Sequence, residues 1–323
     1  SSAITLMADS RIAVVSGASL SLNITSTISG DYGLTYGIAS TTAYSGGATA
    51  TNYNGTVTVG GNNSYKGLTN IALGKVILGA TGSGANSPLG TVDGGTVVNT
   101  GAVLDLNGKN LVTAEPLTIS GTGISNSGAL MNGVSTAATY SGLLTLGATS
   151  SVIAGSGTIA LTNPGIITGA GFELKLGGAA TGSSSISSII GLGTGAVTKQ
   201  DSGTWTLTGA NTYTGITTIS GGILSATLFD IGGNASSLGA SSANASNLVF
   251  SGGSLQYSGT TAASTDRLFT VTATGATALT ISTTSTGSLS FTNSGSIVNS
   301  ASLANRLTLS ANTATTITFN PIW

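Results

Sequence analysis

G-T-W-T-L-T-G-A-N-T-Y-T-G-I-T-T-I-S-G-G-I-L is the sequence from Gly203 to Leu224, and this stretch decides the fold class. Trp205 and Leu207 alternate with threonines, which is the period-2 pattern of a half-buried strand. Ile216 and Ile219 depart from strict alternation before a Gly-Gly pair. Adjacent glycines favour a corner because glycine adopts positive φ without steric cost. The stretch therefore predicts two short strands, joined by a turn and followed by a corner.

The same arrangement occurs earlier, from Gly55 to Val76, as G-T-V-T-V-G-G-N-N-S-Y-K-G-L-T-N-I-A-L-G-K-V. The two stretches align without a gap. The aligned pairs include Asn63 with Asn211, Tyr65 with Tyr213, Gly67 with Gly215, and Gly74 with Gly222. A looser similarity continues beyond them, so the repeat copies extend over residues 55–108 and 203–259. An internal repeat of this kind indicates a repetitive fold.

The composition favours an all-β chain. Glycine supplies 50 of the 323 residues, hydrophobic residues make up 40%, and charged residues only 5%. Disordered chains are usually charged and poor in aliphatic residues, so disorder is the weaker interpretation. Surface helices need Glu, Lys, Arg and Gln, and this chain replaces them with Thr, Ser, Val and Ile, which favour strands.

Short strands without helical crossovers leave a sandwich, a barrel or a parallel β-solenoid. A solenoid explains the uneven strand lengths, the Gly and Asn corners and the low aromatic content of 5%. We therefore predict a parallel β-solenoid with irregular loops. We divide it into N-terminal strands with a possible assembly end (1–30), an irregular Tyr/Gly/Ser/Thr loop or insertion (31–54) and a continuous solenoid (55–323).

The irregular segment from Asp31 to Asn54 is the candidate contact surface. It contains four of the eight tyrosines of the chain, and these are Tyr32, Tyr36, Tyr44 and Tyr53. Because the pattern is not repeated elsewhere in the chain, a specific contact is expected here or at the two ends.

The repeated residues are interpreted as structural corners. Asn63 and Asn211 occupy the turn of each copy, where an inward amide could bond backbone groups of the corner. Tyr65 and Tyr213 are expected to pack beside these turns. A pattern that occurs twice points to architecture rather than to a single binding site.

The two quoted stretches resemble autotransporter-associated β-strand repeats, which occur in passenger regions of bacterial type V secreted proteins and in related giant surface proteins. The resemblance is close over the second copy and looser in the first, where Lys66 and Asn70 replace threonines. It implies a right-handed parallel β-solenoid, export, and a place outside the cell or on the surface of a bacterium. The family motif is structural, so the resemblance implies no catalytic residue.

Little enzymatic chemistry is available to this sequence. The chain has no histidine and no cysteine, which excludes the common Ser and Cys triads and zinc sites. A carbohydrate-active enzyme would need converging carboxylates, for which Asp93 and Asp105 with Lys109 are the candidates, although turn roles fit them better. We predict no catalytic residue, no metal site and no cofactor.

The expected partners are another copy of the chain, joined end to end or laterally, or the surface of a host or neighbouring cell. Eight cations form no basic patch, so nucleic acid is not expected. No apolar run approaches the roughly 18 to 20 residues of a membrane helix, so membrane insertion of this segment is not expected.

Three hypotheses for function follow. The first is a non-enzymatic, exported surface protein that acts as a passenger, stalk or adhesin. The second is a self-assembling subunit of an extracellular fibre or sheath, joined by strand addition between its termini. The third and remote hypothesis is a carbohydrate-active β-helix enzyme.

Overall fold

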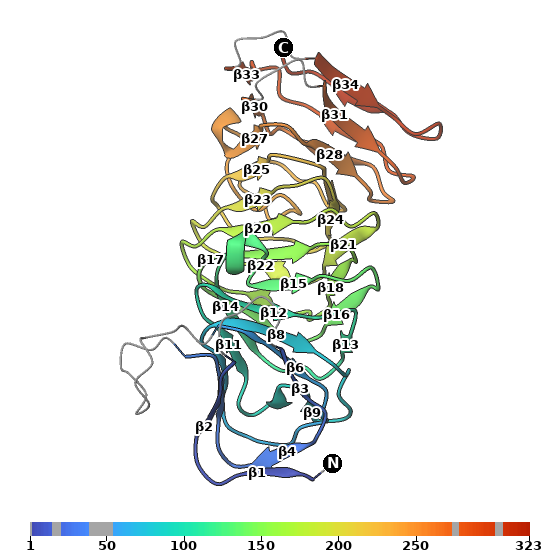
Figure 1. Ribbon diagram of the computed structural model, residues 1–323. Coiled ribbons are helices and arrows are strands. Elements are labelled where there is room, and N and C mark those ends of the chain that lie inside the picture. Colours follow the sequence, from blue (N-terminus) through green and yellow to red (C-terminus); the bar gives the residue numbers. More distant parts are fainter. Residues whose placement is uncertain (1, 15–20, 39–53, 273–277, 301–305) are drawn as a thin grey trace. The chain divides into compact units, whose positions relative to one another are not determined.

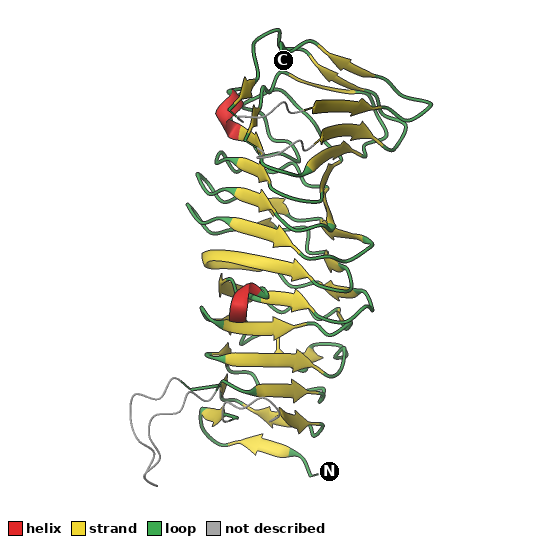
Figure 2. Cartoon of the chain, turned by 45° about the horizontal axis from the view of Figure 1, so that its top comes forward, coloured by secondary structure: helices red, strands yellow, loops and turns green. Residues whose placement is uncertain are grey.

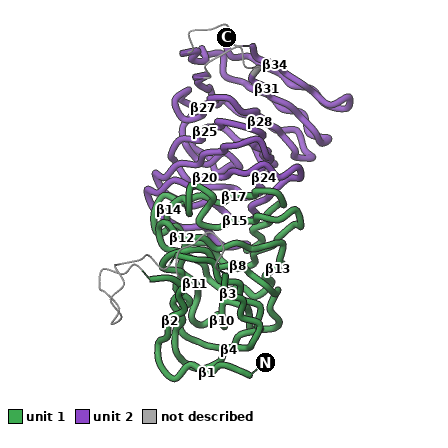
Figure 3. Tube along the Cα trace, in the orientation of Figure 1, with its two compact units in different colours: residues 1–163 green, residues 164–323 purple. Residues whose placement is uncertain are grey.

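The computed structural model describes residues 2–14, 21–38, 54–272, 278–300 and 306–323. The chain divides into two compact units, Ser1–Asn163 and Pro164–Trp323 (Figure 3). Each unit consists of short strands that lie one above another as successive rungs (Figure 2). Within the described residues, no helix is long and apolar enough to cross a membrane.

Unit 1 contains eighteen strands in the described residues and one short 3-10 helix (Figure 1). Their bounds are β1 (Ile4–Leu6), β2 (Ser10–Ile12), β3 (Ser21–Ile24), β4 (Ile28–Gly30), β5 (Leu34–Tyr36), β6 (Thr56–Val59), β7 (Thr69–Ile71), β8 (Gly74–Leu78), β9 (Asn86–Ser87), β10 (Gly90–Thr91), β11 (Thr96–Val98), β12 (Ala102–Asp105), β13 (Asn110–Leu111), β14 (Leu117–Gly121), η1 (Ile124–Asn126), β15 (Leu130–Asn132), β16 (Ala138–Tyr140), β17 (Leu144–Ala154) and β18 (Ile159–Leu161).

Parallel pairing joins the strands of unit 1 into stacked faces. One face runs β2–β5–β7–β11–β14–β17, and a second runs β3–β6–β8–β12–β15–β17. A third face runs β13–β16–β18. The chain passes from one face to the next and returns one rung along, which is the path of a solenoid coil.

Unit 2 contains seventeen strands in the described residues and a second short 3-10 helix. Their bounds are β19 (Ile166–Ile167), β20 (Leu174–Gly177), β21 (Ser183–Ile186), β22 (Ile189–Ile190), β23 (Val197–Lys199), β24 (Thr204–Leu207), β25 (Thr217–Ile219), β26 (Ile223–Ala226), η2 (Ala245–Asn247), β27 (Leu248–Phe250), β28 (Ser254–Tyr257), β29 (Ala263–Thr265), β30 (Thr270–Val271), β31 (Ala278–Thr283), β32 (Leu289–Phe291), β33 (Val298–Asn299), β34 (Arg306–Ser310) and β35 (Ile317–Phe319).

Unit 2 repeats the parallel arrangement. Its faces run β20–β23–β25–β27–β30–β33, β21–β24–β26–β28–β31–β34 and β29–β32–β35. The coils differ in length. Val197 pairs with Thr217, and Thr217 pairs with Leu248 further along the chain, so loops of unequal size leave the faces. The prediction of an all-β, parallel β-solenoid is confirmed.

Alternating burial produces these faces. In β24, Trp205 and Leu207 are buried, while the threonines between them lie toward the outside. β25 differs from the sequence interpretation, because Thr217 and Ile219 point inward while Ile216 is 43% exposed. Thr217 tolerates burial because its hydroxyl group is hydrogen-bonded inside the coil.

The core of unit 2 carries a cluster of aromatic rings at its C-terminal side. Phe269 contacts Phe250 edge-on with ring centroids 5.1 Å apart, and Phe229 contacts Tyr257 in the same way at 5.4 Å. Such pairs contribute about 0.5–1.5 kcal/mol each beyond their buried area. Although aromatic residues are few in the chain as a whole, several of them are clustered in this part of unit 2.

Candidate functional site

The corner of the second repeat copy is held by a buried amide. Asn211 accepts a hydrogen bond from the Ile190 backbone N–H at 2.8 Å, and its Nδ2 donates to the Ser237 carbonyl at 2.9 Å. Both neighbours belong to other coils, so one side chain links three successive levels of unit 2. Beside it, the buried Tyr213 hydroxyl lies 2.8 Å from the Thr217 hydroxyl.

The first copy reproduces this corner bond for bond. Asn63 accepts from the Ile28 N–H at 2.8 Å and donates to the Pro88 carbonyl at 2.7 Å. The buried Tyr65 hydroxyl lies 2.5 Å from the Thr69 hydroxyl. In both copies the asparagine and tyrosine have no exposed surface, and their polar groups bond the protein itself.

The repeated glycines fit places that no side chain can occupy. A Cβ on Gly67 would lie 2.2 Å from the Gly33 nitrogen, and a Cβ on Gly215 would lie 2.2 Å from the Gly195 oxygen. Gly74 and Gly222 adopt φ of 80° and 58°, in the left-handed region that favours glycine. The coils therefore approach each other closely at these four positions.

A buried charge distinguishes the two corners. After the first copy, Glu115 accepts hydrogen bonds from the hydroxyls of Thr96 and Ser87, the latter at 2.8 Å. Burial raises the pKa of the Glu115 carboxyl to about 7, and these hydroxyl bonds oppose the shift in part.

After the second copy, the buried charged group near the corner tyrosine is Arg267. Its Nη2 donates to the Gly239 carbonyl at 2.9 Å and its Nη1 to the Ser241 hydroxyl at 2.8 Å. Burial lowers the pKa of the Arg267 guanidinium. A buried acid thus lies near the Tyr65 corner and a buried base near the Tyr213 corner.

Two further charged groups are bound internally. The Lys199 ammonium donates to three carbonyls, those of Gln200, Asp201 and Gly221, at 2.6, 2.8 and 3.0 Å. Burial lowers the pKa of Lys199 to about 8. Asp105 pairs with Lys75 at 2.6 Å. This partner differs from Lys109, which the sequence suggested as the nearby cation.

The tyrosines of the candidate contact surface lie in different surroundings. Tyr32 is 44% exposed. Tyr36 ends β5 and is buried, so its ring offers no surface to a partner. β5 pairs with β2 and β7, which shows that part of the segment expected to be irregular belongs to a sheet. Tyr44 and Tyr53 lie outside the described residues.

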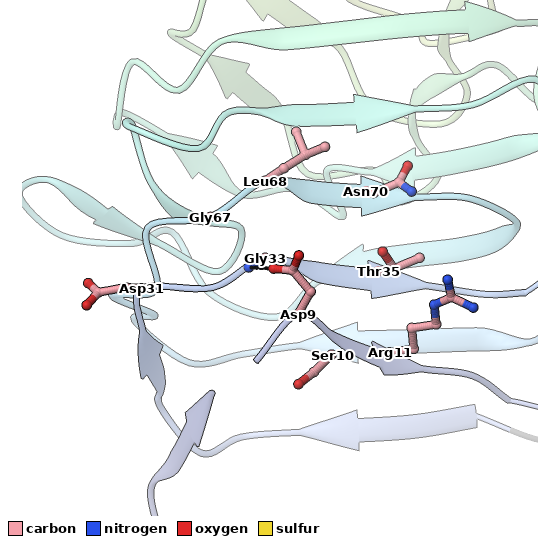
Figure 4. A pocket seen from close by; sticks show the side chains of 9 residues that line it. All are labelled: Asp9, Ser10, Arg11, Asp31, Gly33, Thr35, Gly67, Leu68 and Asn70. Atoms are coloured by element: carbon pink, nitrogen blue, oxygen red, sulfur yellow. Dashed lines mark hydrogen bonds between the residues drawn. The ribbon is translucent and has the colours of Figure 1, made fainter. Parts of the chain in front are cut away.

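A groove of about 420 Å³ lies on the outer face of β2, β5 and β7 (Figure 4). It is lined by Asp9, Ser10, Arg11, Asp31, Gly33, Thr35, Gly67, Leu68 and Asn70. Arg11 stands opposite Thr35, and Thr35 stands opposite Asn70, in the strand register. The backbone of Gly33 and Gly67 forms part of its lining.

Two segments, residues 52–78 and 197–226, match the family described as Passenger-associated-transport-repeat. The chain carries two passenger-associated-transport repeats. It is also similar to the adhesin BmaC autotransporter of Brucella suis biovar 1 (strain 1330), with 33% identity over 226 residues. The aligned region covers 70% of this chain and 5% of the length of that adhesin. No solved structure matches the chain.

These findings confirm the resemblance noted in the sequence. They place the chain outside the cell or at the surface of a bacterium. The two matched segments contain the corners of Asn63 and Asn211 described above.

The sequence interpretation did not single out Glu115, Lys199 or Arg267 as special sites. A weak signal was present in the composition. Charged residues make up only 5% of the chain, so each charged residue was a reasonable candidate for a specific structural or functional role. Their burial could not be predicted from neighbouring residues, because each has at least one partner in another coil: Ser87 for Glu115, Gly221 for Lys199 and Gly239 for Arg267.

Proposed function

We propose that this chain is a non-enzymatic section of a surface adhesin, in which the repeat corners build the scaffold and the unrepeated outer surface makes the adhesive contact. The observation that carries this proposal is the closed bonding of the corners. Asn63, Tyr65, Asn211 and Tyr213 are fully buried and bond other groups of the same chain, which leaves them unavailable to a partner.

The relative supports the adhesive role. That relative is named as an adhesin, and 70% of this chain aligns with it. The surroundings of Asp105 also favour a structural role, because its carboxylate pairs with Lys75 and accepts the backbone N–H groups of Asn107 and Gly133 at 2.9 and 3.1 Å. A carboxylate bonded in this way holds a corner and is poorly placed for acid–base chemistry.

Adhesion is tested with the purified chain coupled to fluorescent beads. We expect the beads to attach to cultured host cells or to bacteria of the same community, and soluble chain to compete with them. Beads coupled to an unrelated all-β protein of similar net charge are the control. Attachment no greater than this control, on every surface tested, would contradict the proposal.

Self-assembly is a second candidate. The observation that favours it is the low charge of the chain, with 5% charged residues and a net charge of −1, which leaves little repulsion between copies. Sedimentation and electron microscopy at increasing concentration test this function, for which fibres are expected. A monomer at every concentration would rule against it.

A further inference from the structure

The groove in unit 1 presents unused hydrogen-bonding groups in one row. Figure 4 shows Arg11, Thr35 and Asn70 side by side on three neighbouring strands. Strands lie about 4.8 Å apart, so the row spans about 10 Å. A neighbouring hollow of about 230 Å³ shares these three residues and continues the groove toward Ile38 and Ala72.

The row offers hydrogen-bond donors. The Arg11 guanidinium makes no hydrogen bond or ion pair with another residue in the part of the chain that the structure describes, and it is exposed. Asn70 accepts a hydrogen bond from the Asn99 amide at 3.0 Å through its Oδ1. This bond fixes the orientation of the Asn70 amide and leaves its Nδ2 group for a ligand.

Acceptors lie next to these donors. Asp9 accepts the Gly33 backbone N–H at 2.8 Å through Oδ1, which orients its carboxylate and leaves Oδ2 for a ligand (Figure 4). The Thr35 hydroxyl in the middle of the row can donate or accept. Donors and acceptors therefore lie together in one groove.

The charges of the groove balance. Arg11 and Asp9 carry opposite charges. The second carboxylate, Asp31, pairs with Lys66 at 2.9 Å and points away from the row (Figure 4). An anionic ligand would meet the Asp9 carboxylate, and an apolar ligand would leave the polar groups unpaired, which costs free energy. A neutral ligand rich in hydroxyl groups avoids both problems.

We propose that this groove binds a neutral saccharide chain, with Arg11 and Asn70 donating to sugar oxygens and Asp9 accepting from sugar hydroxyls. Each sugar hydroxyl both donates and accepts, which matches the mixture of groups in the row. The volume of the groove lies within the range of about 300–1,000 Å³ that small-ligand sites occupy. The inference rests on the proposed function, since a glycan would be the surface component that the adhesin contacts.

The test is saturation-transfer NMR and calorimetry of the full chain with neutral trisaccharides of glucose, galactose and N-acetylglucosamine, and with trigalacturonate as the acidic probe. We expect saturable binding of at least one neutral probe that 0.5 M salt does not weaken, because no net charge is involved. Arg11→Ala and Asp9→Asn should each weaken it about tenfold or more, as expected when a charged hydrogen bond is lost.

The matched control is Arg306→Ala, which removes an exposed arginine from β34 and should leave binding unchanged. Circular dichroism confirms that each variant is folded. Failure of all neutral probes, preference for trigalacturonate, or unchanged binding by folded Arg11→Ala would each overturn the inference.

Bead attachment separates this inference from the proposed function. Wild-type beads that do not attach contradict the adhesive function, whatever the saccharide result. Wild-type and Arg11→Ala beads that attach equally, with no saccharide bound, overturn the groove and leave adhesion in place.

Discussion

The two repeat corners share their bonds and differ in their charges. Asn63 and Asn211 link equivalent backbone groups, and Tyr65 and Tyr213 reach equivalent threonines. A buried charged residue from a later part of the chain lies near each corner. It is the acid Glu115, bonded to Ser87, near the first corner and the base Arg267, bonded to Gly239, near the second. The comparison teaches that the repeat specifies how coils are joined, whereas the electrostatics of each corner are specific to the copy.

The largest effect is expected when the shared amide is removed. Asn63→Ala leaves the Ile28 N–H and the Pro88 carbonyl without their partner, and Asn211→Ala does the same to Ile190 and Ser237. Each unpaired buried group costs about 1–3 kcal/mol, so each substitution should lower the free energy of unfolding by about 2–6 kcal/mol. Denaturant unfolding measures the total, and hydrogen exchange at the Ile28 and Ile190 amides measures the local loss.

The control for this experiment is Asn110→Ala, because Asn110 is exposed on β13 and its loss should change stability by less than about 0.5 kcal/mol. Equal losses in the two copies would support a common corner. A loss confined to one copy would break the comparison, since it would mean that only one amide carries the junction.

A smaller and pH-dependent effect should separate the copies. The Glu115 carboxyl ionises near pH 7 in the folded chain and near 4.5 when exposed. Between these pH values the folded chain keeps a proton on Glu115 that the unfolded chain releases. The contribution of Glu115 to the free energy of unfolding is therefore complete below about pH 4.5 and is lost as the pH rises to about 7. The loss amounts to about 3 kcal/mol, at about 1.4 kcal/mol per pKa unit.

Unfolding of the first unit as a function of pH measures this loss. Glu115→Gln, which cannot ionise, should remove the pH dependence between 4.5 and 7. Arg267→Gln should lower the free energy of unfolding by an amount that does not change with pH between 4.5 and 7, because the guanidinium stays charged throughout. A wild-type stability that is flat from pH 4.5 to 7 would contradict the assignment of a buried, protonatable Glu115.

The fold was predictable because its signals are local. Alternation in Thr204–Leu207 predicts a strand whose side chains alternate between core and surface, and the structure has this strand as β24. The aligned turns of Asn63 and Asn211 predicted equivalent corners from the sequence alone. Such inferences need only neighbouring residues and one internal comparison.

The remaining features depend on which coil lies next to which. The burial of Thr217 instead of Ile216 is decided by the Tyr213 hydroxyl and the Leu238 carbonyl, which belong to different levels. The groove needs β2, β5 and β7 side by side, although β3 and β4 come between the first two in sequence and β6 between the last two. No local pattern reports such contacts, because the length of each coil varies.

The smallest effect should come from the tyrosine hydroxyls, and it tests how closely the corners correspond. Tyr213→Phe removes the bond to Thr217, whose hydroxyl still donates to the Leu238 carbonyl at 3.2 Å. Tyr65→Phe removes the bond to Thr69, whose hydroxyl likewise donates to Leu89. Because neither threonine loses its last partner, each substitution should cost only about 0.5–1.5 kcal/mol by denaturant unfolding.

The matched controls are Tyr213→Leu and Tyr65→Leu, which also remove the ring and should cost about 2 kcal/mol more through lost packing. The tyrosine pair sharpens the comparison because Glu115 lies near Tyr65 and Arg267 near Tyr213. Equal costs at pH 5 and pH 8 in the second copy, with a cost that changes with pH in the first, would show that the copy-specific charge acts on the shared bond. Identical behaviour of both copies at both pH values would show instead that bond and charge act independently.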